Sequence, residues 1–436
     1  MKRVFIETYG CQMNVADTEL IFGVLGREGY LRADSPEGAE LLLVNTCAVR
    51  DNAEQRVIGR MGELQRHKRP GSVLGVVGCM AQRLGPILLE RVPKVDLVVG
   101  PDGYRNLPEL LGHAHAGQRT VDVEYRRWEH YEDIPQVREP GPTAFVTVQR
   151  GCDYRCTFCI VPTTRGPERS RLLADVIGEV RELAAGGTSE VTLLGQTVNS
   201  YHDGTSDFAD LLIAVGAVDG IRRIRFTSPY PTDFTPRVID AMVQTPAVCD
   251  HVHLPVQSGS NSVLRRMSRR YTRERYLEVV DALRTGMPGI TISTDIIVGF
   301  PGETDDEFAD TISMVREAVF DDAYTFKYSV RDGTPAVKIK DHVDDAVATT
   351  RLETLIDVVR DQTRRRNAAR VGEVHEVLVE RPAKRGDLML TRTRRNYVVL
   401  VDLPPAAIGE YRTVRLTGTT GSTFTGALYQ PALAVL

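Results

Sequence analysis

Residues 144–166, AFVTVQRGCDYRCTFCIVPTTRG, join an apolar, strand-like run to a loop with three cysteines. Cys152, Cys156 and Cys159 have the spacing C-x3-C-x2-C, which places three thiolates on one tight loop. A [4Fe–4S] cluster has four irons, and cysteine thiolates normally bind all of them. Three cysteines therefore predict a cluster with one iron open to a ligand from outside the protein. A zinc site with a distant fourth ligand is the alternative.

The chain beyond this loop repeats a strand followed by a helix. Five further strand candidates are EVTLLGQ, RRIRFTS, DHVHLPVQS, TISTDIIVGF and YTFKYSV, and helical stretches such as residues 171–187 separate them. Six such units predict an α/β fold whose centre, residues 142–370, is a (βα)6 partial barrel, because full closure takes eight. The cysteine loop follows the first strand, on the face where barrel enzymes place their chemistry.

The first hundred residues alternate in the same way. Apolar runs at 3–11, 39–47, 72–79 and 95–100 predict parallel strands. The helix expected over residues 17–29 has Asp17 near its start. We expect an N-terminal open parallel-sheet domain at residues 1–125, followed by a polar, proline-containing linker at 126–141.

Three more cysteines, Cys11, Cys47 and Cys79, each end one of these predicted strands. Parallel strands present their carboxyl ends at one edge of the sheet, so the three can converge without a local motif. A single cysteine in such a place is usually a small buried hydrophobe. Three in the same topological position predict a second set of ligands, whereas Cys249 has no partner and is assigned to packing.

The last 65 residues or so change character. Short alternating strands rich in Thr and Val, punctuated by Gly and Pro, predict a small all-β barrel at residues 371–436. From Arg360 onward there are 13 Lys and Arg against 7 Asp and Glu, although the whole chain has a net charge of −4. Arg392, Arg394 and Arg395 beside Tyr397 predict a surface that contacts phosphates and stacks bases, with an ordinary solvated basic strand as the alternative.

Composition narrows the class of protein. A hydrophobic content of 42% and a charged content of 26% are those of a soluble globular protein. No apolar run approaches the ~18 residues of a membrane span, and the first residues do not resemble a signal peptide. Seven cysteines in such a chain favour free thiols in a reducing compartment. We therefore expect a cytoplasmic protein without a membrane partner, and a monomer.

These motifs carry a family resemblance. The spacing C-x3-C-x2-C with Phe158 before the last cysteine resembles the radical S-adenosylmethionine superfamily, and the three N-terminal cysteines and C-terminal barrel make the chain similar to its methylthiotransferases. YGCQMN, NTCAVR, GCMAQR, GQTVNSY and HLPVQSGS most resemble the tRNA enzymes that act on isopentenyladenosine at position 37. Sibling families act on threonylcarbamoyladenosine in tRNA or on a ribosomal-protein aspartate. Thr164 and Thr197 depart from the commoner Tyr and Asn.

The resemblance implies two [4Fe–4S] clusters and S-adenosylmethionine as cofactors. The cluster on Cys152, Cys156 and Cys159 would reduce S-adenosylmethionine to give a radical. An auxiliary cluster on Cys11, Cys47 and Cys79 would carry the sulfur that one S-adenosylmethionine methylates, while a second activates carbon 2 of the adenine. Implied partners are the tRNA anticodon loop, bound in part by a TRAM-like C-terminal barrel, and an electron donor such as a flavodoxin-type reductant.

Other residues have weaker claims to the cofactor pocket. Gln196, Ser228 and Gln257 lie near the ends of predicted barrel strands, and Arg169, like Arg171, offers a planar fork to a carboxylate. Roles in turns, caps or exposed surface are the alternatives for them. The turn VGFPGE at 298–303 is a further candidate for the pocket wall, and His251 and His253 are interpreted as core or rim residues. No catalytic side chain is predicted beyond the cluster ligands.

Two functions outside this class stay open on the sequence. An iron–sulfur electron carrier needs little more than the six cysteines, but it leaves the six strand–helix units and the basic C-terminal region without a role. A zinc-bearing nucleic-acid-binding protein is the other alternative.

Overall fold

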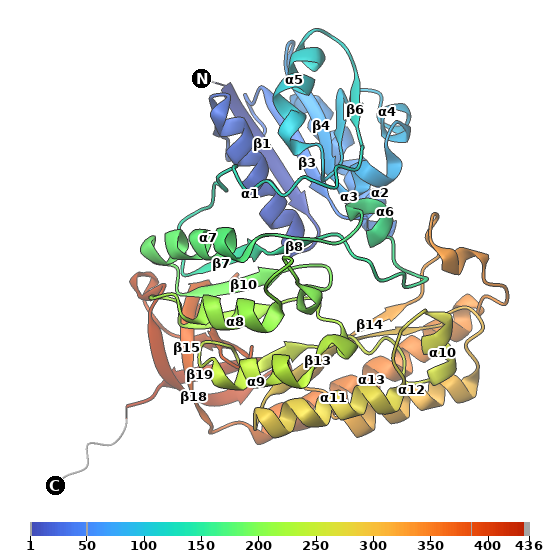
Figure 1. The fold of residues 1–436 in the computed structure, drawn as a ribbon, viewed down its shortest axis with the longest axis vertical. Helices are drawn as coiled ribbons and strands as arrows, with labels where there is room; N and C mark the ends of the chain where they lie inside the picture. The colour runs from blue at the N-terminus through green and yellow to red at the C-terminus, as the bar shows by residue number, and fades with distance from the viewer. Residues whose placement is uncertain (1, 49–50, 385, 431–436) are drawn as a thin grey trace.

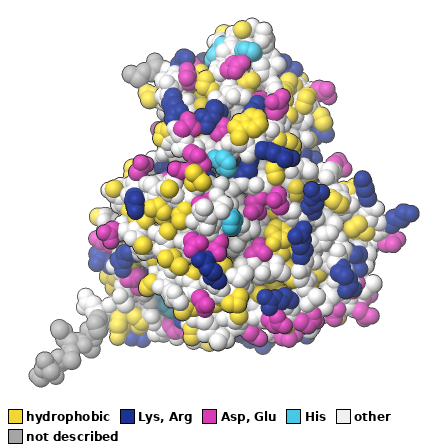
Figure 2. Space-filling model, viewed as in Figure 1, with side chains coloured by type: hydrophobic (Ala, Val, Ile, Leu, Met, Phe, Trp, Pro, Cys, Tyr) yellow, Lys and Arg dark blue, Asp and Glu magenta, His cyan; other side chains and the backbone are white. Residues whose placement is uncertain are grey.

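The computed structural model describes residues 2–48, 51–384 and 386–430. An N-terminal α/β domain lies above a central α/β body, and a small β-barrel packs against another side of that body, at the lower left in Figure 1. The N-terminal domain is the narrower upper lobe of the molecule, and acidic and basic side chains are intermixed over both parts on the face shown in Figure 2. None of the described helices is both long and apolar enough to cross a membrane.

The N-terminal domain is a six-stranded parallel sheet in the order β2-β1-β3-β4-β5-β6. Every residue of the central strands β3 and β4 is buried, because separate apolar clusters cover the two faces of the sheet. The strands are β1 Lys2–Tyr9, β2 Tyr30–Arg32, β3 Leu41–Thr46, β4 Val73–Gly78, β5 Leu97–Val99 and β6 Thr120–Asp122. The helices are α1 Gln12–Arg27, α2 Asp51–Leu64, α3 Cys79–Leu84, α4 Ile87–Arg91 and α5 Leu107–His115.

Helix α1 corrects one expectation. It begins at Gln12, five residues before the predicted start, because Cys11 is the N-cap and its backbone N–H donates to Asn14 Oδ1 at 3.3 Å. Asp17 is therefore a fully buried residue in the helix interior rather than a residue near its start. The short strands β2 and β6, which sequence patterning missed, add one edge strand on each side of the predicted sheet.

The central body confirms the predicted (βα)6 partial barrel. Its six strands follow chain order and are all parallel, as two three-stranded sheets that meet where Ile224 pairs with Val248. Among the described residues the first strand, β7, does not pair with the last, β14, so one side stays open. The strands are β7 Thr143–Thr147, β10 Glu190–Leu194, β11 Arg223–Phe226, β12 His251–His253, β13 Thr291–Val298 and β14 Asp322–Lys327.

Helices cover the outside of this barrel, and one large apolar cluster fills the layer between helices and strands (Figure 1). The helices are α7 Leu173–Ala185, α8 Phe208–Gly216, α9 Pro236–Gln244, α10 Asn261–Arg266, α11 Arg273–Gly286, α12 Asp305–Ala318 and α13 Asp345–Ala369. Between β7 and α7 the chain forms a two-stranded ribbon, β8 Gln149–Arg150 and β9 Arg169–Ser170, and the short helix α6 Val161–Arg165.

The C-terminal region is the predicted small all-β barrel, closed in the order β15-β16-β17-β19-β18 around a core that includes Phe424. Its strands are β15 Val374–Pro382, β16 Met389–Thr393, β17 Val398–Val401, β18 Tyr411–Thr419 and β19 Thr423–Leu428. Closure removes the free sheet edges that would otherwise pair with another chain.

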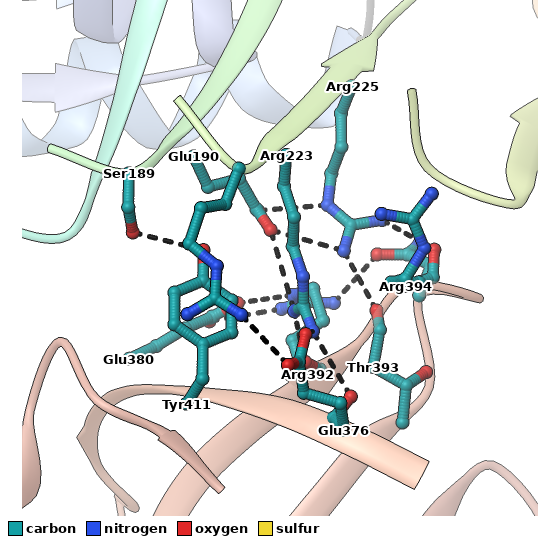
Figure 3. A network of polar contacts seen from close by, with 12 residues as sticks. Ser189, Glu190, Arg223, Arg225, Glu376, Glu380, Arg392, Thr393, Arg394 and Tyr411 are labelled. Atoms are coloured by element: carbon teal, nitrogen blue, oxygen red, sulfur yellow. Dashed lines mark hydrogen bonds and ion pairs between the residues drawn. The ribbon is translucent and has the colours of Figure 1, made fainter. Parts of the chain in front are cut away.

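Hydrogen bonds and ion pairs of several arginines join this β-barrel to the amino-terminal side of the partial barrel (Figure 3). Arg223 of β11 is fully buried, and its Nη atoms donate to the carbonyl of Arg392 at 2.8 Å and to Glu376 Oε1 at 3.1 Å. Its neighbour Arg225 donates to Glu190 Oε1 at 2.8 Å and to the carbonyl of Thr393 at 2.8 Å.

The same network corrects the expectation that Arg392, Arg394 and Tyr397 form a free surface for phosphates. Arg392 donates to Glu380 Oε1 at 2.6 Å, and Arg394 donates to the carbonyl of Val248 at 2.6 Å. Tyr397 is buried within the C-terminal core. Arg392 is therefore paired within the C-terminal barrel and Arg394 binds acceptors across the domain junction, which a pattern of cations beside an aromatic residue cannot reveal.

We predict that Arg223→Ala loosens the docked C-terminal barrel, because it leaves the carbonyls of Arg392 and Glu376 without their donor and removes one of the two arginines beside the buried Glu190. The expected loss is about 3–5 kcal/mol in the free energy of unfolding, measured by urea denaturation. The neighbouring Arg222→Ala is the control, since the Arg222 side chain is 51% exposed against 1% for Arg223 and its pair with Glu376 is worth about 1 kcal/mol or less. Equal losses in the two variants would contradict a special role for the buried arginine.

Candidate active site

A cavity of about 1400 Å³ lies between the N-terminal domain and the carboxyl ends of the barrel strands and continues into the barrel. Its wall comes from all three parts of the chain: residues around Cys11, the cysteine loop and barrel strands, and the Glu380 and Arg392 side of the C-terminal barrel. This position is where open α/β sheets and barrels hold ligands. Four of the six predicted ligand cysteines line it, namely Cys11, Cys152, Cys156 and Cys159.

The cysteine loop between β8 and α6 is a compact turn with donors directed at its sulfurs. The N–H of Cys159 donates to the carbonyl of Cys156 at 3.0 Å. Arg269 Nη1 donates to Cys156 Sγ at 3.1 Å, and Cys152 Sγ lies 3.0 Å from Thr197 Oγ1. Burial raises the pKa of Cys159 to about 12. Thiols in such a place need a metal to become thiolates at neutral pH, and hydrogen bonds to sulfur tune a bound cluster.

Thr197 belongs to a buried chain of polar contacts. Gln149 accepts from the backbone N–H of Thr197 at 3.2 Å and donates to Ser200 Oγ at 3.0 Å. The hydroxyl of Ser200 donates to Glu168 Oε2 at 2.7 Å. One of the two departures from the resembled motifs, Thr197, is therefore in contact with a predicted ligand sulfur, and its backbone is held by this chain of contacts.

Gln196, Ser228 and Gln257, which were predicted to belong to the cofactor pocket, lie near the ends of barrel strands and all line the cavity. Ser228 and Gln257 have φ angles of 57° and 68°, in the left-handed region, which costs about 1–3 kcal/mol each and occurs mainly at functional sites. The buried Oε1 of Gln196 has no hydrogen-bond donor among the described residues. An unsatisfied amide and two strained polar residues fit a polar cofactor such as S-adenosylmethionine.

Phe158 also lines the cavity and packs edge-on against Phe300, with ring centroids 6.5 Å apart. The turn at 298–303 lies behind it: Glu303 accepts from the N–H of Gly299 at 2.9 Å and pairs with Arg351 of α13 at 2.8 Å. That turn therefore anchors a helix and is not part of the cavity wall.

The structure corrects the prediction that Arg169 lines the cofactor pocket. Its guanidinium forms a two-pronged pair with Asp102 of the N-terminal domain at 2.9 and 3.0 Å, and it does not line the cavity. Arg171 does line the cavity, but its Nη1 is bound to Glu179 at 2.5 Å and to the carbonyl of Thr147 at 2.9 Å. Both arginines have carboxylate partners within the chain, which the sequence did not show.

Two histidines occupy the barrel interior. His251 and His253 lie 3.1 and 3.0 Å from the Ser293 hydroxyl, and His253 Nε2 is 3.2 Å from Asp295 Oδ2. They line the lower part of the cavity as satisfied rim residues. Cys249 is buried in the layer beneath them and has the packing position expected of it.

The N-terminal cysteines end three adjacent strands, β1, β3 and β4, at one edge of the sheet. A Cβ added to Gly10, which has φ of 148°, would lie 2.8 Å from Cys47 Cβ. A hydrogen bond with Cys47 and the charge of Arg165 lower the pKa of Cys11 to about 6. Cys79, at the start of α3, is buried, and Arg165 Nε donates to its sulfur at 3.1 Å.

Neither set of three cysteines has its sulfurs arranged around a single metal ion in the described residues. Sulfurs around one tetrahedral zinc lie about 3.8 Å apart, given Zn–S bonds of about 2.3 Å. Within residues 2–48, 51–384 and 386–430, no group of three His, Cys, Asp or Glu side chains is arranged to hold one metal ion.

The fold and the cysteine loop define a radical S-adenosylmethionine protein. The Radical SAM superfamily model matches residues 146–315, the uncharacterized protein family UPF0004 matches 3–100, and the TRAM domain matches 368–428. Two solved structures share the fold. The radical S-adenosylmethionine methyltransferase TsrM from Kitasatospora setae has a TM-score of 0.58 and 17% identity over 77% of each chain. The cobalamin-dependent enzyme OxsB has a TM-score of 0.55 and 14% identity over 82% of this chain and 56% of its own.

Curated relatives narrow the class. A tRNA-2-methylthio-N(6)-dimethylallyladenosine synthase from Opitutus terrae is 44% identical over 98% of both chains. Another from Geobacter metallireducens is 45% identical over 95% of this chain and 96% of its own. The chain belongs to the tRNA-2-methylthio-N(6)-dimethylallyladenosine synthase family. This confirms the family resemblance read from the sequence motifs.

Glu168 makes the stability of this region depend on pH. Burial raises its pKa to about 7, so the folded protein binds a proton that the unfolded chain releases near pH 4.5. Stability is therefore lost as pH rises from about 4.5 to 7. We predict that Glu168→Gln stabilises the protein at pH 8 by about 1–2 kcal/mol, allowing for partial solvent screening, and changes little below pH 4.5. Urea denaturation at pH 4 and pH 8 measures this, and an equal effect at both would contradict it.

Proposed function

We propose that this chain is a tRNA methylthiotransferase that adds a methylthio group to carbon 2 of isopentenyladenosine at tRNA position 37. One observation carries the proposal: Cys11 of the N-terminal set and all three cysteines of the radical loop line a single cavity. A sulfur held at one site and a radical generated at the other can then reach the same atom. The relatives that share 42–45% identity over nearly the whole chain have this named activity.

The residues fit two clusters and S-adenosylmethionine. Cys152, Cys156 and Cys159 would hold the radical cluster, and Cys11, Cys47 and Cys79 the auxiliary one. When bound, these groups supply the radical, the methyl group and the transferred sulfur. The amide of Gln196 and the polar ends at Ser228 and Gln257 would orient the cofactor, and Phe158 would form an apolar part of its wall.

The chain's own residues prepare the radical site in two ways. Arg269 directs an N–H donor at the sulfur of Cys156, and Thr197 Oγ1 lies 3.0 Å from Cys152 Sγ, where its hydroxyl would donate to a cluster-bound thiolate. Donors to these sulfurs would favour the reduced, more negative state of a cluster. The guanidinium of Arg269 is also held between the rings of Tyr230 and Tyr271, 4.5 and 5.2 Å from their centroids. Its position is therefore set before any cofactor binds.

The substrate would be the anticodon loop of tRNA, with adenosine 37 turned out of its stack into the cavity. The first and last barrel strands, β7 and β14, do not pair among the described residues, and both contribute residues to the cavity wall, so a base would enter on that side. The match of residues 368–428 to the TRAM domain supports a part for the C-terminal barrel in RNA binding. A flavodoxin-type electron donor, a monomeric state, a cytoplasmic location and domain limits at 1–125, 142–370 and 371–436 complete the proposal.

The test is nucleoside mass spectrometry of tRNA from cells that lack this gene, complemented with variants. The triple alanine variant of Cys11, Cys47 and Cys79 should bind about four irons instead of about eight. It should still release 5′-deoxyadenosine, because the radical loop is intact, and should make no methylthio-adenosine. Cys156→Ala should show the reverse defect, with the auxiliary cluster kept and no 5′-deoxyadenosine formed.

Methylthiolated tRNA from the N-terminal triple variant would show that the sulfur comes from elsewhere. Modification of threonylcarbamoyladenosine instead of isopentenyladenosine would move the chain to the sibling activity. Release of no 5′-deoxyadenosine by a wild-type protein with both clusters would favour an electron carrier.

Thr197 offers a finer test of the radical site. We predict that Thr197→Val slows 5′-deoxyadenosine release about 10- to 100-fold, the range seen when a hydrogen bond to a metal ligand is removed. Thr197→Ser keeps the hydroxyl and should retain most of the rate. Quantified product from single-turnover mixtures checks this, and equal rates in the two variants would dismiss the hydroxyl as a contributor.

A further inference from the structure

Three charged side chains are buried where the N-terminal domain meets the radical loop. Asp17 of α1 pairs with Arg150 of β8 at 3.0 Å and with Arg165 of α6 at 2.6 Å. The exposed fractions of the three side chains are 0%, 5% and 3%. The other polar neighbour of Asp17 is the hydroxyl of Tyr104, a neutral donor at 3.2 Å. Two guanidiniums therefore face one carboxylate, so these three side chains have a formal charge of +1, and Arg150 is also attracted to the buried carboxylate of Glu129.

This surplus charge lies on the side of Arg165. Arg150 has a second interaction, with the ring of Tyr131 at 5.1 Å from its centroid. Arg165 instead directs Nε at Cys79 Sγ, 3.1 Å away. Its Nη1 is buried and finds no hydrogen-bond acceptor among the described residues. A buried cation with an unused donor is stabilised by a further anion. The guanidinium of Arg165 faces the edge of the N-terminal sheet that has the cysteine sulfurs.

We propose that Arg165 is a positioning residue of the auxiliary site, contributed across the domain junction by the radical domain. The inference rests on the proposed function, in which Cys11, Cys47 and Cys79 hold a cluster. Three thiolates around a [4Fe–4S] core give it a net negative charge, and donors to its sulfurs raise its reduction potential. The guanidinium of Arg165 offers both the missing positive charge and a hydrogen bond to one ligand sulfur.

The placement of Arg165 also links the two sites physically. It follows Cys159 by six residues, at the end of the short helix that continues the radical loop. Helix α6 packs against α3, whose first residue is Cys79. The segment that continues the radical loop therefore also brings the Arg165 cation to the auxiliary site.

The experiment uses full-length protein with Cys152, Cys156 and Cys159 replaced by alanine, so that only the auxiliary site can hold iron. After anaerobic reconstitution with iron and sulfide, iron content and the midpoint potential of the cluster are measured, the latter by redox titration followed by EPR. Arg165→Gln, Arg165→Lys and Asp17→Asn are compared in this background. Arg169→Gln is the matched control, because Arg169 is also a buried arginine of the radical domain that pairs with the N-terminal domain, through Asp102.

Arg165→Gln removes the charge and should lower the potential. We expect at least a tenfold change in the ratio of oxidised to reduced cluster at a fixed potential, or about 59 mV for a one-electron couple. Arg165→Lys keeps the charge and should change the ratio less than threefold, as should Arg169→Gln. Asp17→Asn increases the surplus charge, so its potential should move upward.

Several outcomes would support or overturn the proposed role of Arg165. Loss of iron from Arg165→Gln alone, with about four irons kept by the lysine variant and by Arg169→Gln, supports the inference. The inference is overturned if Arg165→Gln and Arg169→Gln give ratios of oxidised to reduced cluster that agree within threefold. A downward shift of the midpoint potential in Asp17→Asn also overturns it. Either result leaves the proposed function intact. Absence of iron from the parent with Arg165 in place overturns the proposed function, and the inference with it.

Discussion

Both cysteine sites depend on one property of parallel sheets, which is that every strand delivers its carboxyl end to the same edge. In the N-terminal sheet the adjacent strands β1, β3 and β4 each lead directly into a cysteine. In the partial barrel the same property brings the cysteine loop together with the ends of β10, β11 and β12. Because the two carboxyl edges face one another across the domain junction, a single cavity is reached from both. Two sites more than 70 residues apart in the sequence thus share one reaction space.

Buried arginines hold the three parts in this arrangement. Arg150, Arg165 and Arg169 reach acids of the N-terminal domain, and Arg223 reaches the C-terminal barrel on the other side. A buried ion pair contributes little net stability once its desolvation is counted. A guanidinium, however, has several N–H donors in a fixed planar arrangement, so its carboxylate or carbonyl partners must lie at matching positions. These contacts therefore specify how the domains dock, whereas the apolar clusters within each domain provide most of the stability.

The cavity wall retains features that packing alone would remove. Ser228 and Gln257 keep left-handed backbone conformations, and the buried Oε1 of Gln196 lacks a donor among the described residues. All three occur at the ends of barrel strands, next to the cysteine loop. Strain and unsatisfied polar atoms lower stability, and they persist in proteins chiefly where a ligand uses them. Their concentration here agrees with a site shaped for a polar cofactor rather than for a compact core.

Local spacing in the sequence was enough to predict the α/β class, the six barrel units, the C-terminal β-barrel and the two sets of three cysteines. Strand periodicity and ligand spacing are properties of residues close together along the chain, so they can be read without the fold. The positions of Gln196, Ser228 and Gln257 at the cavity wall were predicted in the same way, because the end of a strand is a local feature.

Only the tertiary structure decided which partner each charged residue has. Arg169 and Arg394 were assigned to ligands, yet their acceptors belong to segments 67 and about 146 residues away. Asp17 was expected near the start of a helix, and nothing in the sequence marked Arg165 or Arg269 as contacts of a cysteine sulfur. A charge shows in the sequence as a residue type, but its role depends on which opposite charge the fold brings within about 4 Å. That distance is set by domain docking, which no local pattern encodes.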